Sequence, residues 1–395
     1  MPEGHDPIAL KAALKAYARE VGLDVVGVAS VAPFLAEKEH LEHRQAAGLG
    51  PNPFEYPEVS PRVYPDLLLP GARSIIAAGI SYLVPESPSA GGPLRGWLSR
   101  YCRGLDYHTV LEDRLEQVAG WLEARVPDVH TLIHVDTGAS LDRPIAERAG
   151  LGKLGKSTNL IVPRLGTWVF LGEILTDASL PPDEPSTMRV CGNCTRCIDA
   201  CPTGCISEWQ VDANRCIGYV TQMDGPVPPE YRELMGNRLF GCDDCQDVCP
   251  YNARPVSGLH PEFAPLPEIG AEPDLLGLLA MSAPEFERVY GPTAAAWRGL
   301  EPLQRNSVVA LGNSGAPAAF EPLTETLEHR SPLLRAHAAW GLGRLATLRP
   351  TLSPGAVEAL VGRLAVEDAP EVRLEIGQAL AALSAAEDGQ ERGGQ

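Results

Sequence analysis

The sequence predicts an α+β protein built from three successive parts. The first 180 residues alternate helix-like and strand-like patterns, which indicates an α/β domain over 1–180. Residues 181–258 are rich in cysteine and too irregular for long elements, which indicates a cluster-binding module. After a proline-rich passage, three similar apolar segments predict a helical repeat domain over 275–385. A length of 395 residues agrees with two to three domains of ordinary size.

The first part begins with an amphipathic helix over 6–21, where apolar residues recur at helical spacing. The same spacing predicts a second helix over 107–125. Short apolar runs rich in β-branched residues have the length and composition of buried strands. These strands are expected at 23–29, 73–83, 131–135 and 168–175.

The helical tail repeats a pattern of its own. Leu311, Leu342 and Leu380 occupy matching positions in the three similar segments, 31 and 38 residues apart. This spacing predicts a short HEAT-like array, although periods of about 40–47 residues are more typical. An ordinary helical bundle is the alternative interpretation.

Composition and charge are those of a globular protein. Apolar residues make up 44% of the chain and charged residues 21%, and no apolar stretch approaches the ~20 residues that cross a bilayer. The N-terminal residues lack the basic start and apolar core of an export signal, so we expect a cytoplasmic protein without a membrane partner. A net charge of −18 argues against a general nucleic-acid binder, although opposite charges nearly balance in 95–165 and 301–350.

The cysteines are the strongest functional signal. All but Cys102 lie between Cys191 and Cys249, and a reducing cytosol would not maintain them as disulfides. Residues 191–202 follow C-x2-C-x2-C-x3-C-P, the bacterial [4Fe–4S] run, in which a tight loop presents three thiolates to one cluster. A second frame at 242–250 repeats the end of this run, so the pattern predicts two clusters.

In such paired runs the cysteine before the proline ligates the other cluster, so the two last cysteines exchange places. The first cluster is then assigned to Cys191, Cys194, Cys197 and Cys249. The second is assigned to Cys201, Cys216, Cys242 and Cys245. Zinc bound by the CxxC pairs is the alternative. Cys205 is left over, and we expect it to be a small buried residue.

The first part supplies candidates for the reaction that the clusters serve. Asp136 lies at the end of a predicted strand, where a carboxyl group can face a cleft and donate a proton. A turn or helix-capping role is the alternative for this residue. The chain has neither a phosphate loop nor a G-x-G-x-x-G sequence after a strand, so a nicotinamide-binding fold is not supported.

Taken together, these motifs resemble the epoxyqueuosine reductase family. The resemblance covers about 5–345 and rests on Asp-Tyr-His at 106–108, Val-Asp-Thr-Gly at 135–138, Ala-Glu-Arg-Ala-Gly-Leu-Gly at 146–152, and the cluster module. That family is similar to the reductive dehalogenases. The resemblance therefore implies a nitroreductase-like domain that holds cobalamin beside two [4Fe–4S] clusters.

The resemblance also implies a reaction, the reduction of epoxyqueuosine to queuosine at the wobble position of tRNA. Electrons would pass from an unidentified low-potential donor through the clusters to cobalamin. Asp136 would protonate the departing oxygen, and burial against the cofactor would help to keep it protonated. The residues expected to line the corrin are Arg62, Cys102, Asp136, Lys156, Ser157, Gly218 and Asp243. Arg62 and Lys156 also fit solvated surface charges.

Further expectations concern the neighbours of this site and the partners. The glycine of a D-x-H-x-x-G corrinoid motif is replaced by Leu111, so His108 is not expected to ligate cobalt. Tyr107 and His108 would either face the substrate or cap the following helix. Phosphate contacts are expected from arginines of the tail unless these pair with acids such as Glu301 and Glu328; the arginines are Arg305, Arg330, Arg335 and Arg344.

Two competing functions remain at this point. One is a cobalamin-dependent, dehalogenase-like reductase of a small molecule. The other is an electron carrier without catalytic activity, in which a ferredoxin module sits on a helical scaffold. For the epoxyqueuosine reductase reading, we expect a monomer.

Overall fold

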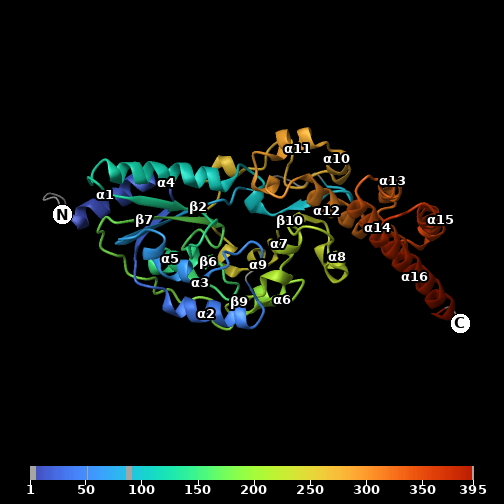
Figure 1. Ribbon diagram of the computed structural model, residues 1–395, viewed down its shortest axis with the longest axis horizontal. Coiled ribbons are helices and arrows are strands. Elements are labelled where there is room, and N and C mark those ends of the chain that lie inside the picture. The colour runs from blue at the N-terminus through green and yellow to red at the C-terminus, as the bar shows by residue number, and fades with distance from the viewer. Residues whose placement is uncertain (1–5, 51, 86–90, 394–395) are drawn as a thin grey trace. The chain divides into compact units, whose positions relative to one another are not determined.

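The computed structural model describes residues 6–50, 52–85 and 91–393 (Figure 1). The chain forms two compact units, and neither is continuous in sequence. The first unit is made of 1–85, 105–216 and 243–264. The second is made of 86–104, 217–242 and 265–395. The cysteine region contributes to both units, and the boundaries expected at 180 and 258 stay predictions.

The first unit is built on a four-stranded antiparallel sheet in the order β1–β2–β7–β4. Its strands are β1 (Val25–Ser30), β2 (Ser74–Ser81), β4 (Thr131–His134) and β7 (Val169–Thr176). All four predicted strands are therefore confirmed. Every residue of β2 is buried, because this central strand is covered on both faces, whereas the edge strand β4 is only half-buried.

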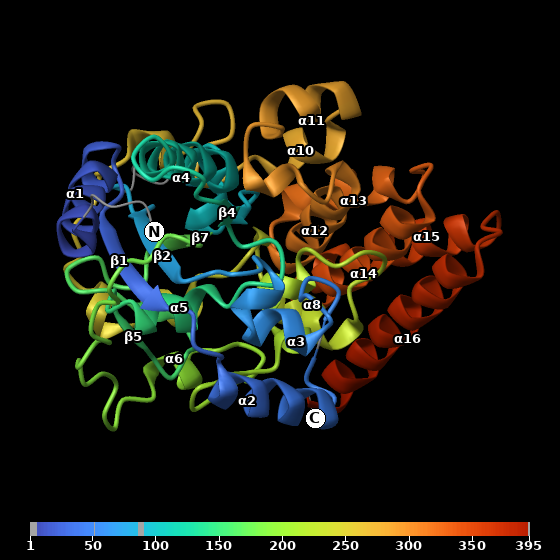
Figure 2. The same cartoon turned by 60° about the vertical axis from the view of Figure 1, so that its left-hand side comes forward.

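Helices cover both faces of this sheet (Figures 1 and 2). The predicted helices appear as α1 (Pro7–Glu20) and α4 (Tyr107–Glu123), which lie together on one face. The opposite face is covered by α5 (Asp142–Arg148), which the sequence analysis did not predict. Successive residues of β7 face opposite sides of the sheet. A side chain at Gly172 would contact Leu115 of α4, whereas the neighbouring Glu173 faces the side that α5 covers.

Short elements complete the first unit. The remaining helices and strands are α2 (Leu35–Ala46), α3 (Val59–Val63), β5 (Lys153–Leu154), β6 (Leu160–Ile161), α6 (Arg196–Asp199), β8 (Ile206–Ser207), β9 (Gln210–Val211) and α9 (Asp244–Asp247). Single 3₁₀ turns are η1 (Pro65–Leu67), η3 (Ala213–Arg215), η4 (Pro250–Asn252) and η5 (Pro261–Phe263). The predicted irregularity of the cysteine region is confirmed, since its helices span one turn each.

The second unit is mostly helical. It contains a short parallel pair, β3 (Trp97–Leu98) with β10 (Arg238–Phe240), and the one-turn helix α7 (Ile217–Val220). Its other helices are α8 (Pro229–Met235), α10 (Leu275–Ala280), α11 (Ala283–Tyr290), α12 (Leu300–Asn313), α13 (Phe320–Thr326), α14 (Pro332–Leu348), α15 (Ser353–Leu364) and α16 (Pro370–Gly393). Its 3₁₀ turns are η2 (Arg100–Cys102), η6 (Ala294–Ala296), η7 (Pro317–Ala319) and η8 (Pro350–Leu352).

Within this unit, α14 packs between α12 and α16, as the array in Figure 2 shows. The helices approach closely where small residues face each other. A Cβ at Gly312 would lie only 2.7 Å from the Cα of Gly341, and one at Gly343 would lie 3.0 Å from the Cβ of Ala379. The repeated Leu311 and Leu342 are fully buried. The predicted repeats therefore stack by their apolar faces.

The structure corrects the expectation that tail arginines line one RNA-binding face. Arg305 is fully buried, and its guanidinium donates to the carbonyl oxygens of Met223 at 2.7 Å and Gly225 at 2.6 Å. Burial lowers its pKa to about 10. Two others are ion-paired: Arg335 binds Glu367 through two hydrogen bonds of 2.7 and 2.8 Å, and Arg344 lies 2.9 Å from Glu233. Of the four, Arg330 is exposed. The acids that pair with them are not Glu301 and Glu328, which the sequence analysis had named.

The buried side chain of His337, also in this unit, makes the stability of the folded protein depend on pH. The ring of His337 is fully buried, with Nδ1 at 2.7 Å from the carbonyl of Leu333 and Nε2 accepting the Val227 N–H at 3.1 Å. Burial, and next the charge of Arg232, lowers the pKa of His337 to about 3. In the unfolded chain, histidine has a pKa near 6.5. Between pH 6.5 and pH 3, His337 is therefore mostly protonated in the unfolded chain and mostly neutral in the folded chain.

We accordingly expect His337 to cost the folded protein about 2 kcal/mol of stability between pH 7 and pH 5. Glutamine at this position can make both hydrogen bonds but does not titrate in this range. Denaturant unfolding of the wild type and of His337→Gln at pH 7 and pH 5 measures the difference. Equal losses in the two proteins would show that His337 is not the group responsible.

Candidate functional site

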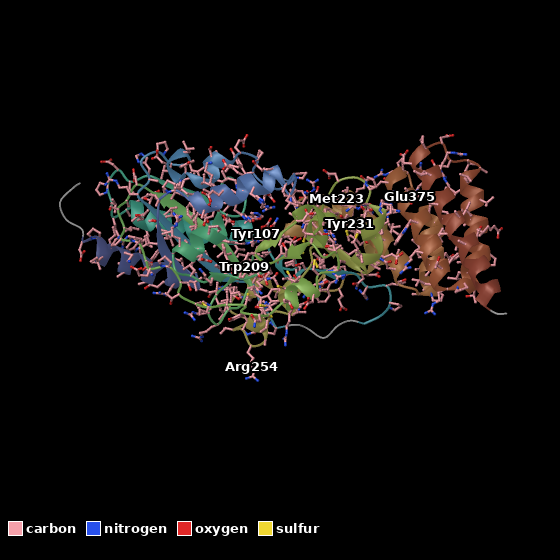
Figure 3. All side chains as sticks on the ribbon, turned by 90° about the horizontal axis from the view of Figure 1, so that it is seen from below. Tyr107, Trp209, Met223, Tyr231, Arg254 and Glu375 are labelled. Atoms are coloured by element: carbon pink, nitrogen blue, oxygen red, sulfur yellow. The ribbon has the colours of Figure 1, made fainter. Side chains whose placement is uncertain are left out.

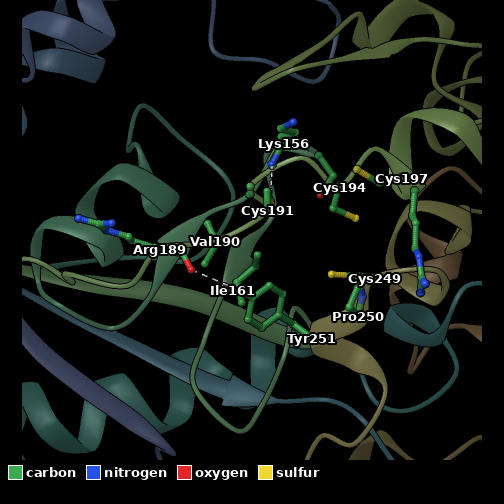
Figure 4. A pocket seen from close by; sticks show the side chains of 14 residues that line it. Lys156, Ile161, Arg189, Val190, Cys191, Cys194, Cys197, Cys249, Pro250 and Tyr251 are labelled. Atoms are coloured by element: carbon green, nitrogen blue, oxygen red, sulfur yellow. Dashed lines mark hydrogen bonds between the residues drawn. The ribbon is translucent and has the colours of Figure 1, made fainter.

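Four cysteines of the first unit line one hollow of about 400 Å³ (Figure 4). They are Cys191, Cys194, Cys197 and Cys249, the set predicted for the first cluster, and none is in a disulfide. The loop that presents them is tight, because Cys191 and Gly192 both have positive φ and the Cys194 N–H donates to the Cys191 carbonyl at 2.8 Å. The structure thus brings the last cysteine of the second run to the first three of the first run.

The hollow suits a group held by thiolates. Burial raises the pKa of Cys197 and of Cys249, and the neighbouring Cys191 thiol raises both further. Because crowded, buried thiols ionise poorly by themselves, a positively charged centre bound among them would be strongly favoured. The backbone N–H of Lys156 also points to the Cys191 sulfur at 3.4 Å. These residues fit a cubane cluster, and their role as its ligands stays a prediction.

The cysteines predicted for the second cluster are divided between the units. Cys201, Cys216 and Cys245 belong to the first unit, and Cys242 ends a segment of the second. Cys205, which was expected to be buried, is buried, and its sulfur lies 3.4 Å from that of Cys201 and contacts Cys216. Two predicted ligands of the second cluster, Cys201 and Cys216, therefore lie next to the thiol of Cys205.

Two of the predicted cofactor residues, Lys156 and Ser157, line the hollow of the first cysteine set. Lys156 is 3% exposed, and its Nζ lies 2.5 Å from Glu208 and 5.5 Å from the centre of the Trp209 ring. The alternative of a solvated surface charge is therefore wrong for Lys156. Its backbone thus lies beside Cys191, and its side chain extends to Glu208 and Trp209, between β8 and β9.

The other predicted cofactor residues lie in different parts of the chain. Arg62, at the end of α3, is half-buried; its Nε is buried without a hydrogen-bond partner in the described structure. Asp243 is 2% exposed and belongs to the first unit. Cys102 and Gly218 belong to the second unit, where the Cys102 thiol is fully buried and lies 3.1 Å from the Ser99 carbonyl.

Asp136 lies two residues after the end of β4, at a positive φ of 55°. The Tyr107 hydroxyl donates to its Oδ2, and the Nε2 atom of His108 lies 3.7 Å from the same oxygen. The Asp136 side chain is 59% exposed. The Asp136 carboxyl group is thus held by the Tyr107 hydroxyl and remains accessible to a ligand. Figure 3 labels Tyr107.

The structure assigns the helix cap to a neighbour of Tyr107 and His108. Asp106 caps α4 by accepting the His108 N–H at 3.0 Å, and its Oδ1 also lies 2.8 Å from His108 Nδ1. Burial lowers the pKa of His108, but the hydrogen bond to Asp106 and the nearby carboxylates outweigh it, so the net shift is upward. Tyr107 and His108 therefore turn towards Asp136.

Buried polar atoms without partners occur in α4, in β4 and the loop that follows it, and in β7. Among the residues that the structure describes, they include His108 Nε2, His134 Nε2, Ser140 Oγ and Glu173 Oε1. Such atoms are costly to bury unsatisfied, and a bound polar ligand would satisfy them. The amide groups around a corrin ring can donate and accept hydrogen bonds, so the donor set is compatible with cobalamin.

Two acidic residues of this region were missed by the sequence analysis. Glu173 is 1% exposed in β7, and Asp142 begins α5, which packs against that strand. Burial raises the pKa of both carboxyl groups, and the charge of Asp136 raises both further. The sequence did hold a signal, because Glu173 is the one charged residue in the apolar run at 168–175.

Comparison with known proteins decides the family. Residues 62–137 match the family model described as epoxyqueuosine reductase QueG, DUF1730. The epoxyqueuosine reductase of Bacillus subtilis is 39% identical over 382 residues, which cover 95% of this chain and 96% of that protein. The chain belongs to the epoxyqueuosine reductase family. The Bacillus cereus family member is 41% identical over 341 residues, 85% of this chain and 89% of that protein.

Solved epoxyqueuosine reductases have the same fold. One was crystallised with an epoxyqueuosine-modified tRNA stem loop; it has a TM-score of 0.89 at 37% identity and covers 96% of this chain and 100% of its own. The enzyme from Streptococcus thermophilus has a TM-score of 0.86 at 30% identity, over 95% and 99% of the two chains. A Bacillus subtilis structure was solved with its catalytic aspartate loop swung out of the active site.

Further matches confirm the predicted architecture. Residues 190–252 match a 4Fe-4S double cluster binding domain, and residues 300–381 match HEAT repeats. The predicted fold class of an epoxyqueuosine reductase is thereby confirmed, and an ordinary bundle is not the better description of the tail. No helix in the described part of the chain is long and apolar enough to span a membrane.

Proposed function

We propose that this chain reduces the epoxide of epoxyqueuosine in tRNA to the alkene of queuosine. The observation that carries the proposal is the combination, in one epoxyqueuosine reductase chain, of a four-cysteine hollow and an exposed carboxyl group held by Tyr107. A relative crystallised with a modified tRNA stem loop supports tRNA as the substrate. The small-molecule reductase and the electron carrier lack a comparable observation.

The clusters and cobalamin supply the electrons of this reaction. The two clusters would be held by the cysteine sets predicted above, and clusters of this kind reach potentials as low as about −700 mV. Cobalamin, when bound, would supply a reducing metal centre for the carbon–oxygen bond. We propose that the residues that hold it are Arg62, Cys102, Asp136, Lys156, Ser157, Gly218 and Asp243. An unidentified low-potential donor, a monomeric state and a cytoplasmic location belong to the same proposal.

Asp136 and its neighbours would donate a proton to the oxygen that leaves the epoxide. Loss of the epoxide oxygen as water requires two electrons and two protons. Asp136, positioned by the Tyr107 hydroxyl, would deliver a proton to the departing oxygen, and its exposed face leaves room for the substrate. The imidazole of His108 would stand beside this carboxyl group and favour its correct orientation.

The decisive experiment is turnover of tRNA that carries epoxyqueuosine. Full-length protein, reconstituted with iron, sulfide and cobalamin under anaerobic conditions, should convert it to queuosine with a chemical reductant. Nucleoside analysis by mass spectrometry measures the product. A protein that binds both cofactors but leaves the modified tRNA unchanged would refute the proposal, and reduction of a halogenated phenol instead would favour the small-molecule reductase.

A further inference from the structure

A column of stacked rings begins at Tyr107, the residue that holds Asp136. The rings of His108 and Tyr107 stack with their centres 4.1 Å apart, and Tyr107 stacks on Phe170, also at 4.1 Å, with the two planes inclined by 10°. Phe170 in turn stacks on Tyr82 at 4.3 Å. Tyr107, Phe170 and Tyr82 are each at most 8% exposed, so the column runs through the interior of the first unit.

The register of the sheet and the start of α4 bring these rings together. Phe170 lies in β7 opposite Ile80 of β2, and Tyr82 follows Ile80 by two residues. Diagonal neighbours on one face of two paired strands are within reach of aromatic side chains. Phe170 faces the same side as Gly172, the side that α4 covers, and Tyr107 is the first residue of α4.

The other end of the column is anchored beside the cysteines. The side-chain amide of Gln246 donates to the Tyr82 hydroxyl at 3.1 Å and to the Thr167 carbonyl at 3.0 Å. Gln246 lies in α9, directly after Cys245 and three residues before Cys249. Cys245 is a predicted ligand of the second cluster and Cys249 of the first. Bound clusters therefore fix both ends of the stretch that carries Gln246.

Asp136 needs such support because little else in its loop holds it. It lies in a stretch without regular secondary structure, at a φ of 55°, and its side chain is 59% exposed. The Tyr107 hydroxyl sets the orientation of its carboxyl group. Misplacement of a catalytic group by about 1 Å can lower a rate by about 100-fold. Stacked neighbours restrict the tilt of the Tyr107 ring, since any shift would open a gap in a packed interior.

We propose that Phe170, Tyr82 and Gln246 are positioning residues for the proton donor. They hold the Tyr107 hydroxyl against Asp136 and make its placement depend on whether the clusters are bound. The inference rests on the proposed function, in which Asp136 donates the proton. Loss of either cluster frees one end of the stretch that carries Gln246, and the column then holds Tyr107 less firmly. The acid is thus correctly placed only in a chain that can also deliver electrons.

Three variants test the column. Phe170→Leu keeps much of the buried volume but offers no ring face to Tyr107. Phe263→Leu is the matched control, because Phe263 is 2% exposed and meets Phe170 edge to face at 5.2 Å, outside the stack. Tyr82→Phe keeps the ring and removes the hydroxyl that Gln246 binds. Thermal unfolding and iron content check that each full-length protein is folded and carries its clusters.

The first readout needs no activity. Hydrogen exchange measured by mass spectrometry reports how often the backbone of 135–140 opens. In cluster-loaded Phe170→Leu this segment should exchange severalfold faster than in the wild type, whereas in Phe263→Leu it should keep the wild-type rate. Equal exchange in Phe170→Leu and the wild type overturns the positioning role.

The same measurement tests the dependence on the clusters. Removal of the clusters with a chelator should speed the exchange of 135–140 severalfold in the wild type. Loaded and cluster-free Tyr82→Phe should differ much less, because the hydroxyl that joins the column to Gln246 is gone. Wild-type exchange that is the same with and without clusters overturns the coupling, as does a Tyr82→Phe protein that responds like the wild type.

The second readout is the kinetics of epoxyqueuosine reduction. Phe170→Leu should lower kcat by about 10- to 100-fold and leave KM for the tRNA unchanged, because a misplaced acid affects the chemical step. Phe263→Leu should keep both constants. Wild-type kcat in Phe170→Leu, or a raised KM with kcat unchanged, overturns the role. A wild type that does not reduce epoxyqueuosine refutes the proposed function, whereas the exchange measurement still decides whether the rings and the clusters hold the segment that carries Asp136.

Discussion

Asp136→Asn is expected to lower the turnover of epoxyqueuosine tRNA by about 10²–10⁴-fold. Asparagine can still accept the hydrogen bond from the Tyr107 hydroxyl and tolerates the positive φ of this position, but it has no proton to donate. The clusters should remain bound, because Asp136 lies outside the four-cysteine hollow. Cobalamin should also remain bound, because asparagine keeps the shape of the side chain. Single-turnover kinetics, with iron content and the visible spectrum recorded on the same sample, measure both outcomes.

Asp128→Asn provides a matched control for this substitution. Asp128 is also an exposed aspartate with positive φ, at 57°, in a loop of the same unit. The control should keep wild-type turnover, since no residue of the candidate site contacts it in the described structure. Near-wild-type turnover by Asp136→Asn would exclude the aspartate as the proton donor, whatever the control does.

Loss of Cys201 is expected to remove the second cluster and spare the first. Cys201 belongs to the first cysteine run, but the hollow formed by the first three cysteines of that run is completed by Cys249. Because the sulfur of Cys205 lies 3.4 Å from that of Cys201 and could replace it as a ligand, the double variant Cys201→Ala/Cys205→Ala is the stringent test. Its iron content should fall from about eight atoms to about four per chain.

Electron paramagnetic resonance of the reduced proteins identifies the cluster that is lost. The reciprocal variant Cys249→Ala should lose the first cluster and keep the second, so the two variants should show complementary spectra. Cys205→Ala alone should keep both clusters. Should Cys201→Ala/Cys205→Ala lose the first cluster and retain the second, the crossed assignment would be wrong.

Local patterns were enough to place the strands of the sheet, two of its covering helices and the first set of cysteines. Alternating and helical spacings located the four strands of the sheet and the helices α1 and α4, because each element buries one face or both against the rest of its unit. Helix α5 was missed, since it is only seven residues long and offers few turns for a periodic pattern. The spacing of cysteines also grouped Cys249 with the first run, because ligand geometry constrains the chain locally.

The family itself was also within reach of the sequence. The motifs around 106–108, 135–138 and 191–202 point to an epoxyqueuosine reductase, and relatives that cover nearly the whole chain confirm it. Motifs of this kind are readable because the chemistry restricts both residue type and spacing. The role of each residue in the motif is less readable, as the capping by Asp106 rather than by Tyr107 or His108 shows.

Only the tertiary structure decided which charged groups are buried. Arg305 reads as a surface residue of a helix, yet it is fully buried and satisfies carbonyl groups more than 70 residues away in the chain. Lys156 is buried and hydrogen bonds to Glu208, and burial together with the charges of Asp142 and Asp136 raises the pKa of the Glu173 carboxyl group. The free energy of a buried charge depends on partners that come from distant segments, so no local pattern reveals it. The sequence therefore determined the family, the strands of the sheet and the helices α1 and α4, whereas the fold determined which charged groups are buried.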